Sequence, residues 1–422
     1  MRCFKRHTIK LIAVLLLLQL SCVEEFEPKS EVKEDTEQLA SALVVDGLLT
    51  DEFKRHKIIL TRVFSFEEEN PAPESGALVK IVSSIGAEQI FEESEPGIYF
   101  SQAEFSAQEG EEYTLNIDTR NGDTYYSEKV TMPEKIAINN LRADRVINDN
   151  GEDGVGIFLD NTSTTLESTY FRYEYQETYK IIAPKWDPFK LNVVRYEPCF
   201  VDPFVVEIIP WSDERRVCYS SNNSQRIIQT SSTDLENSAI DNFQIHFIDS
   251  DNYIISHRYS INVKQYSQTQ EAFSFYERLS DFSSSDNVFS QIQPGFFQGN
   301  MFSASNNGEE KVLGYFEVAS VTSERLYFNY EDIFPGESLP PYAINCETLG
   351  SPRLIPRAYH CASPGVCDGN CESPLIEQIL AGLITFAAEK EDDFISPYFT
   401  LPSPCGDCTK LGSNNVPEFW IE

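Results

Sequence analysis

The first 21 residues constrain this chain most, because they determine the compartment in which the rest must fold. The chain opens with a basic head made of Arg2, Lys5, Arg6 and Lys10. An unbroken apolar run follows from Leu11 to Leu18, far shorter than the about 20 apolar residues that cross a bilayer. A basic head, a short apolar run and a small residue before a cut site predict a secretory signal peptide over residues 1–21.

The residue after the predicted cut is Cys22, which follows the small Ser21. This arrangement resembles a bacterial lipoprotein signal, in which the cysteine becomes the lipidated N-terminus, although Gln19 stands where an aliphatic residue is usual. The resemblance implies a lipid on Cys22. The alternative is ordinary cleavage that leaves Cys22 as a free thiol, but a lone exposed thiol is a liability in an oxidising compartment.

An acidic tether is predicted over residues 22–41, which are charged and poor in apolar residues. Glu24, Glu25 and Glu27 resemble the signal that sends Bacteroidota lipoproteins to the outer face of the outer membrane. The simpler interpretation of these residues is a solvated linker. We expect a lipid-anchored protein of the outer membrane that faces the cell exterior and touches the membrane only through its N-terminal lipid.

The charge and composition of the chain exclude some partners and favour β-structure. Residues 1–21 hold four of the 33 Lys and Arg and none of the 67 Asp and Glu, so the mature chain carries a net charge of −38. Such a body repels nucleic acid. The 29 Phe, 20 Tyr and 3 Trp favour sheet and are too many for a disordered acidic chain.

Alternating apolar residues and regularly spaced turns predict an all-β fold of two domains. Residues 42–133 carry short strands with glycine punctuation, including the hairpin signal Asn121-Gly122, and predict an Ig- or transthyretin-like β-sandwich of about seven strands. Residues 134–400 predict a larger β-sandwich-type domain with one or two helices. Residues 401–422 form a cysteine-containing tail.

Two helices are predicted within the larger domain. The first covers residues 268–282, where Ser267 and Gln270 form a capping-box pattern and apolar residues then fall on one helical face. The second covers residues 374–390, with Ser373 as N-cap and Pro374 as first residue.

Eight cysteines remain after Cys3 leaves with the signal and Cys22 takes the lipid: Cys199, Cys218, Cys346, Cys361, Cys367, Cys371, Cys405 and Cys408. An even number in an exported chain predicts disulfides rather than zinc. Neither a metal nor a cofactor is expected. Cys199 and Cys218 bracket a short loop and are the favoured single bridge, and the other six would join the 345–390 region and the tail to the body.

A recognition loop is predicted around Trp186 and Trp211, in a stretch rich in proline and aromatic residues. The alternative is that these aromatic residues belong to the core and the strand surfaces, the commoner role. No G-x-S-x-G or H-E-x-x-H motif occurs. A triad can only be recognised by its geometry, so no catalytic residue is assigned.

Three segments together resemble a Bacteroidota family of outer-membrane lipoproteins known as domain of unknown function 4249. They are Leu43–Thr50, Asn287–Ser320 and Cys405–Trp420. The middle segment is the specific one, with Gln293-Pro294, Gly299-Asn300 and Leu313-Gly314-Tyr315-Phe316. Residues 345–390 depart from the family pattern by their length and cysteine content. Members of the family are typically encoded beside TonB-dependent receptors, which implies a role at such a receptor.

We therefore expect a non-enzymatic surface lipoprotein that binds or assists a TonB-dependent receptor in nutrient capture or uptake. One alternative is a secreted hydrolase that acts on glycans or peptides, which would need a cleft with converging carboxylates or a His-centred triad. Another is a structural or adhesive surface module.

Overall fold

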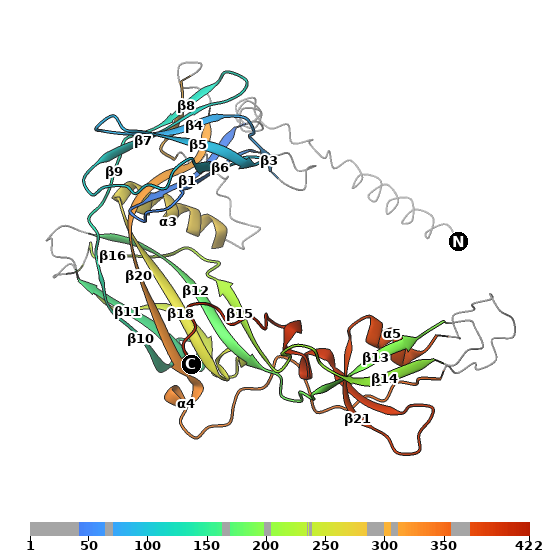
Figure 1. Cartoon of the computed structure of the whole chain (residues 1–422). Helices are drawn as coiled ribbons and strands as arrows, with labels where there is room; N and C mark the ends of the chain where they lie inside the picture. The colour runs from blue at the N-terminus through green and yellow to red at the C-terminus, as the bar shows by residue number, and fades with distance from the viewer. Residues whose placement is uncertain are drawn as a thin grey trace, which may run out of the picture.

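The computed structural model describes residues 42–63, 71–162, 169–197, 204–233, 235, 239–284, 299–304, 311–355 and 372–422. The fold is all-β, as the sequence predicts, and has three units: an N-terminal sandwich, a second sandwich and a module that projects from the second sandwich (Figure 1). No helix in these ranges combines the length and the apolar character needed to cross a membrane.

The N-terminal sandwich begins directly after the predicted tether. Its strands are β1 (Leu43–Thr50), β2 (Lys57–Arg62), β3 (Ala72–Pro73), β4 (Leu78–Ser83), β5 (Glu88–Glu95), β6 (Ile98–Ser101), β7 (Glu112–Asp118), β8 (Thr124–Ser127) and β9 (Val130–Thr131). Alternate residues of β7 are buried, as a strand with one core face requires. The predicted Asn121-Gly122 turn joins β7 to β8, and Gly122 has a φ of +92°.

A strand from much later in the chain completes this sandwich. The first eight residues of β20 (Val312–Asn329) pair in parallel with β1, and the rest of β20 pairs antiparallel with β18 (Arg258–Gln268). β19 (Met301–Ser303) pairs with β8 at the far edge. One strand therefore belongs to both sandwiches and links them through continuous backbone hydrogen bonds.

Residues of two segments that resemble the family, Leu43–Thr50 and Asn287–Ser320, meet along β20. The carboxamide of Asn300 donates to the Phe316 carbonyl at 2.8 Å and accepts from the Phe316 N–H at 2.9 Å. Gly314 has a φ of +90°, and a Cβ there would lie 1.9 Å from the Val45 carbonyl oxygen. A Cβ on Gly299 would lie 1.7 Å from the Gly314 oxygen, so these glycines permit backbones to approach closely.

The second sandwich packs two sheets face to face. One sheet holds β12 (Tyr170–Ile182), β15 (Val217–Asn223), β16 (Ile228–Ser231), β18 and the second half of β20. The other holds β10 (Ile138–Ile147), β11 (Asp153–Thr162) and β17 (Ala239–Asp249). The core between them is rich in aromatic residues, among them the fully buried Phe171, Tyr173 and Tyr259. Two short helical turns, η1 (Tyr253–Ile255) and α4 (Tyr330–Ile333), lie beside this core.

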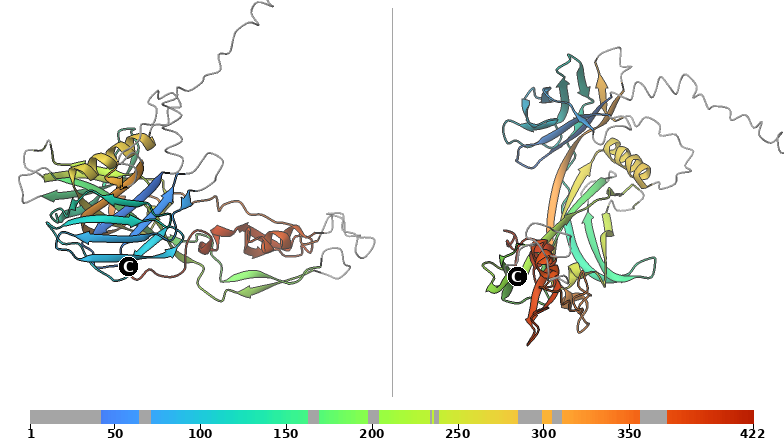
Figure 2. Two further views of the ribbon diagram at one scale, coloured as in Figure 1. Left: turned by 90° about the horizontal axis from the view of Figure 1, so that it is seen from above. Right: turned by 90° about the vertical axis from the view of Figure 1, so that its right-hand side faces the viewer.

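The first predicted helix is present as α3 (Gln270–Ser284), close to its expected range. Phe275 stacks on Tyr315 of β20 with ring centroids 4.8 Å apart, so the helix lies against the junction of the two sandwiches (Figure 2). The predicted capping role of Ser267 is wrong, because Ser267 is still part of β18. Thr269 caps instead, since its hydroxyl accepts from the Ala272 N–H at 3.2 Å.

The second predicted helix is correct at its start and wrong in its length. α5 spans Pro374–Leu380, and the Ser373 hydroxyl caps it as predicted. Gly382, at a φ of +64°, ends the helical turn, and Ile384–Glu389 form strand β21, which pairs with β22 (Tyr398–Pro402). A continuous apolar run fits a buried helix or a buried strand equally well, so periodicity could not detect the change.

The projecting part, which we call the distal module, consists of β13 (Phe189–Arg195), β14 (Val205–Pro210), α5, β21 and β22 (Figures 1 and 2). Among its described residues, the main apolar cluster buries Leu191, Leu375 and Phe386, so this part of the core is small. The turns η3 (Ser403–Cys405) and η4 (Cys408–Lys410) connect it to the second sandwich. A core of this size needs covalent support.

Residues after η4 lie across the outer face of the second sandwich. Ser413 and Tyr219 exchange backbone hydrogen bonds at 2.8 Å, and the Trp420 ring packs edge-on against Tyr219. The Arg325 guanidinium lies 3.7 Å from the centroid of the Phe419 ring. The C-terminal segment is therefore part of the sandwich surface.

Gly314→Ala tests the junction between β1 and β20. We expect the free energy of unfolding to fall by more than about 3 kcal/mol, because the new methyl group must push the Val45 backbone aside. Gly122→Ala is the matched control, since Gly122 has a similar φ but open space around it, and should cost only about 1–2 kcal/mol. Equal losses in chemical denaturation would show that the close approach does not matter.

Candidate binding site

A pocket at the base of the distal module contains one of the two predicted recognition residues, Trp211. The hairpin of β13 and β14 brings the segments that hold Trp186 and Trp211 together, because the Trp211 N–H donates to the Pro188 carbonyl at 3.0 Å. The pocket has a volume of about 270 Å³, and Leu191, Ile384 and Phe386 give it an apolar floor.

Three cations and one carboxylate surround this pocket, although the whole chain is strongly acidic. The Lys190 ammonium lies 4.8 Å from the centroid of the Trp211 ring, and the Arg215 guanidinium lies 5.0 Å from it. Lys410 and Asp407 also line the pocket. In the described part of the chain, neither lysine has a carboxylate within ion-pair distance. The pocket therefore suits a ligand with an apolar body and a negative group.

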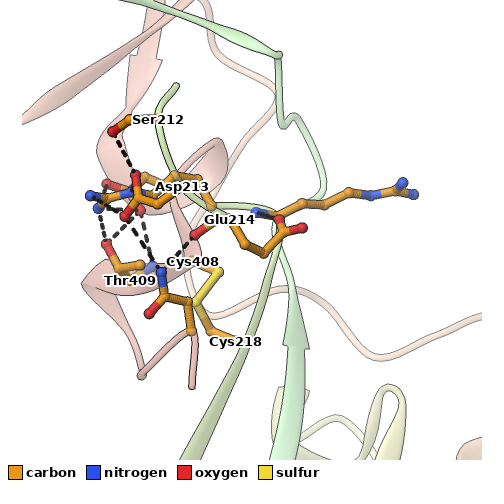
Figure 3. A network of polar contacts seen from close by, with 10 residues as sticks. Ser212, Asp213, Glu214, Cys218, Cys408 and Thr409 are labelled. Carbon is orange, nitrogen blue, oxygen red and sulfur yellow. Dashed lines mark hydrogen bonds and ion pairs between the residues drawn. A yellow bond between two sulfur atoms is a disulfide. The ribbon is translucent and has the colours of Figure 1, made fainter. Parts of the chain in front are cut away.

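Arg215 is held in place by a polar network (Figure 3). It forms ion pairs with Asp213 at 3.0 Å and with the buried Asp407 at 3.3 Å, and it donates to the Thr409 hydroxyl at 2.6 Å. Burial opposes the charge of Arg215, but these carboxylates outweigh it and raise the pKa of the guanidinium. Arg215 thus fixes one wall of the pocket and is not a free anion-binding group.

The two predicted recognition residues have different environments. The indole N–H of Trp211 is buried and has no acceptor among the described residues, which leaves a donor unsatisfied. Trp186 is 36% exposed and does not line the Trp211 pocket. Lys190, Arg215 and Lys410 were not predicted from the sequence, although the basic pair Arg215-Arg216, which begins four residues after Trp211, was an available signal.

The structure pairs four of the eight cysteines and corrects one predicted bridge. Cys218 is bonded to Cys408, and Cys346 is bonded to Cys405 (Figure 3 draws the first). The predicted Cys199–Cys218 bridge is therefore wrong, because a short loop in the sequence says nothing about which thiols the sheets bring together. Cys199, Cys361, Cys367 and Cys371 lie outside the described residues.

The two disulfides join the C-terminal segment to two other parts of the chain. Cys408 bonds to Cys218 of β15 and so connects the C-terminal segment to the second sandwich. Cys405 bonds to Cys346, which lies in the chain between α4 and α5. The C-x-x-C pair thus has two separate partners and is not a redox dithiol bridge. The predicted choice of disulfides over zinc is confirmed for these four cysteines. No group of three His, Cys, Asp or Glu in the described ranges is placed to hold a metal ion.

The three histidines in the described ranges have different surroundings. His56 is buried in the N-terminal sandwich, where its Nε2 bonds to the Phe105 carbonyl at 2.9 Å and burial lowers its pKa. His257 lines a cavity of about 580 Å³ beside residues 339–347. His246 is the only one of the three that contacts both a hydroxyl and a carboxylate.

His246 lies in a chain of hydrogen bonds between the two sheets of the second sandwich. The Tyr175 hydroxyl lies 3.0 Å from Nδ1 of His246, and Nε2 lies 3.5 Å from a Glu177 carboxylate oxygen. The Tyr259 hydroxyl donates to the same oxygen at 2.6 Å, and Asn222 donates to the other at 3.0 Å. The sequence hydroxyl, imidazole, carboxylate resembles a catalytic triad. Its hydroxyl is a phenol and its carboxylate is buried, so we interpret these bonds as a structural link between the two sheets.

These bonds set the ionisation of Glu177. Burial disfavours the charged carboxylate, but the hydrogen bonds from His246, Tyr259 and Asn222 outweigh burial and lower the pKa of Glu177. The folded protein therefore holds this carboxylate ionised at neutral pH.

A family comparison identifies the chain. The family model described as "Domain of unknown function (DUF4249)" matches residues 25–325, which is more than half of the chain. The chain belongs to this family. The matched residues of this DUF4249 protein include both sandwiches up to Arg325 and end before the second half of the distal module, so α5, β21, Cys346 and Cys405 lie beyond them.

Comparisons with curated proteins and solved structures add only distant likenesses. No curated protein matches. A DUF4785 family protein from Legionella pneumophila aligns at 8% identity with a TM-score of 0.19 over 53% of this chain and 52% of its own. This chain thus spans about half the length of that protein. The Yersinia pseudotuberculosis adhesin InvE aligns at 10% identity with a TM-score of 0.16, over 82% of this chain and 78% of its own.

Peptide mapping under non-reducing conditions tests the disulfides. We expect linked peptides for Cys218–Cys408 and Cys346–Cys405. Cys408→Ser should cost about 2–5 kcal/mol of stability, because the bridge closes a long loop in the unfolded chain. Cys199→Ser is the control and should leave the Cys218–Cys408 peptide intact. A Cys199–Cys218 peptide from the native protein would contradict this pairing.

Glu177→Gln tests the bonds between the sheets and their pH dependence. A carboxylate with a lowered folded pKa stabilises the protein above its unfolded pKa of about 4.3, and that contribution is lost as pH falls through the folded pKa. We expect the variant to lose about 1–3 kcal/mol at pH 7. The difference from wild type should shrink towards pH 3 in urea titrations.

Glu347→Gln is the matched control for this experiment. Glu347 pairs with Lys185 at the surface and its side chain is 81% exposed, so its loss should cost less than about 1 kcal/mol at either pH. A difference between Glu177→Gln and wild type that stays constant from pH 7 to pH 3 would contradict the assignment.

Proposed function

We propose that this DUF4249 protein is an exported lipoprotein, anchored through Cys22 at the outer membrane of a Bacteroidota cell. It serves there as a non-enzymatic binding partner of a TonB-dependent receptor in nutrient capture. The sequence supports the anchor through the signal pattern of residues 1–21 and the acidic residues that follow.

The separation between the start of β1 and the distal module supports the proposal. β1 begins at Leu43, right after the tether, and pairs there with the start of β20. The distal module leaves the second sandwich near the other end of β20, where Tyr179 of β12, Tyr259 of β18 and Phe328 of β20 lie side by side. At 3.3 Å per residue, Val312 at the start of β20 and Phe328 near its end are roughly 55 Å apart along the strand.

We infer from this separation that the two ends of the molecule have different roles. The N-terminal sandwich is the unit nearest the lipid and is available to the receptor. The distal module, with the Trp211 pocket, lies at the other end of the second sandwich and is available to ligands in the medium. Rigid β units with binding residues in their loops are common in recognition proteins.

A hydrolase is less well supported by the contacts of the described residues. The hydroxyl, imidazole and carboxylate that do meet, at His246, lie between two sheets, and the Trp211 pocket contains one carboxylate that is already paired with Arg215. Neither arrangement offers a nucleophile with an adjacent base in an open cleft.

Photo-crosslinking in cells tests the partnership and the orientation. A photoreactive residue in place of Ile85, which is 75% exposed on the N-terminal sandwich, should crosslink to a TonB-dependent receptor. The same residue in place of Phe394, which is 82% exposed on the distal module, is the matched control and should not. Mass spectrometry of crosslinked outer membranes reads the result. Recovery of no receptor from either position would refute the partnership.

Cys22→Ala tests the anchor independently. The variant should move from the membrane fraction to the soluble periplasmic fraction and lose the Ile85 crosslink, because only the lipid holds the protein at the surface. Retention of the variant in the membrane would overturn the anchor.

A further inference from the structure

A second cavity lies on the outer face of the second sandwich, under α3. Its volume is about 550 Å³, within the usual range for small-molecule sites. β12 has two edge partners, and they leave a gap: β15 pairs with it from Gln176 onward and β16 pairs with it up to Tyr173. The loop at residues 224–227 crosses this gap, and Tyr276 of α3 closes the cavity from the other side.

The lining of this cavity is rich in neutral polar groups. Four carboxamides line it: Gln176, Asn223, Gln225 and Asn262. Each carboxamide offers a donor and an acceptor at a fixed spacing. The Asn262 side chain has no hydrogen bond to any other described residue. Gln176 donates to the Asn223 side chain at 3.3 Å and Gln225 donates to the Asn223 carbonyl at 3.1 Å, and their remaining donors and acceptors are open to a polar ligand.

The charges around the cavity nearly cancel. The buried Arg172 pairs with Glu174 and, at 3.0 Å, with the fully buried Glu317, and Lys264 pairs with Glu52 at 2.9 Å. Arg226 is exposed and has neither an ion pair nor a hydrogen bond within the part of the chain that the structure describes. The lining thus has one uncommitted positive charge, which is too little to attract a polyanion in so acidic a chain.

One wall of the cavity is rigid. The Arg172 guanidinium lies 4.4 Å from the centroid of the Tyr266 ring and 4.9 Å from that of the Tyr276 ring. Gln268 donates to Glu317 at 2.6 Å and so supports the carboxylate that holds Arg172. Nε of Arg172 is buried without a partner. This clamp fixes Tyr276 over the sheet, where its ring can pack on an apolar face of a ligand.

We propose that this cavity binds a saccharide, neutral or bearing a single carboxylate. Sugar hydroxyls both donate and accept, which matches carboxamides better than cations. The C–H face of a sugar ring supplies the apolar surface that Tyr276 can cover. Arg226 would pair with the carboxylate of an acidic sugar. This inference rests on the binding role proposed above and adds a second ligand site to it, which can be tested on the purified protein without a receptor.

The experiment measures binding of purified full-length protein in detergent to a glycan array of neutral oligosaccharides and their uronic-acid counterparts, followed by calorimetry. We expect binding to one or more glycans. Asn262→Ala should weaken it at least tenfold, because Asn262 has no structural partner to lose. Arg226→Ala should weaken acidic glycans at least tenfold and neutral ones little.

Matched controls separate the site from the general surface. Asn415→Ala and Arg216→Ala change exposed residues of the same types elsewhere and should leave affinity unchanged. Wild-type protein that melts cooperatively yet binds no glycan would overturn the inference, and so would binding that Asn262→Ala leaves intact. If glycans bind but the receptor crosslink fails, only the partnership proposed above falls.

Discussion

The architecture depends on the backbone hydrogen bonds of β20. This strand pairs with β1 in one sandwich and with β18 in the next, so neither sheet is complete without it. Such pairing joins residues almost 270 positions apart and requires two backbones to approach closely, which Gly314 permits. Because Asn300 binds both backbone groups of Phe316, it fixes the register there. Asn300, Gly314 and Phe316, on which the resemblance to the family was based, thus lie where one ladder joins the two units.

The junction between the sandwiches contains a buried ion pair, which is costly for a fold. Glu317 is fully buried and faces Arg172, and burying both ions removes more hydration energy than a single contact returns. The hydrogen bond from Gln268 and the rings of Tyr266 and Tyr276 offset part of that cost. An apolar junction would be cheaper, so this network is the natural place to seek a binding role. The adjacent cavity has the chemistry for one.

The distal module has a different source of stability. Its apolar core is small, and its base depends on two disulfides and on the ion pairs of Arg215. Both disulfides use cysteines of the C-terminal segment, so the last residues of the chain fasten the module to the second sandwich. Half of the module also lies beyond the residues that match the family model.

Local sequence determined the all-β fold, the Asn121-Gly122 hairpin, α3 and the start of α5, because periodicity, turn residues and caps act over a few positions. The recognition loop around Trp186 and Trp211 stays a prediction. The sequence could not reveal which strands pair, where α5 gives way to β21, or that Cys218 joins Cys408 rather than Cys199. Those outcomes, and the gathering of Lys190, Arg215 and Lys410 around one indole, were decided by tertiary structure, since they depend on contacts between residues that sequence distance does not relate.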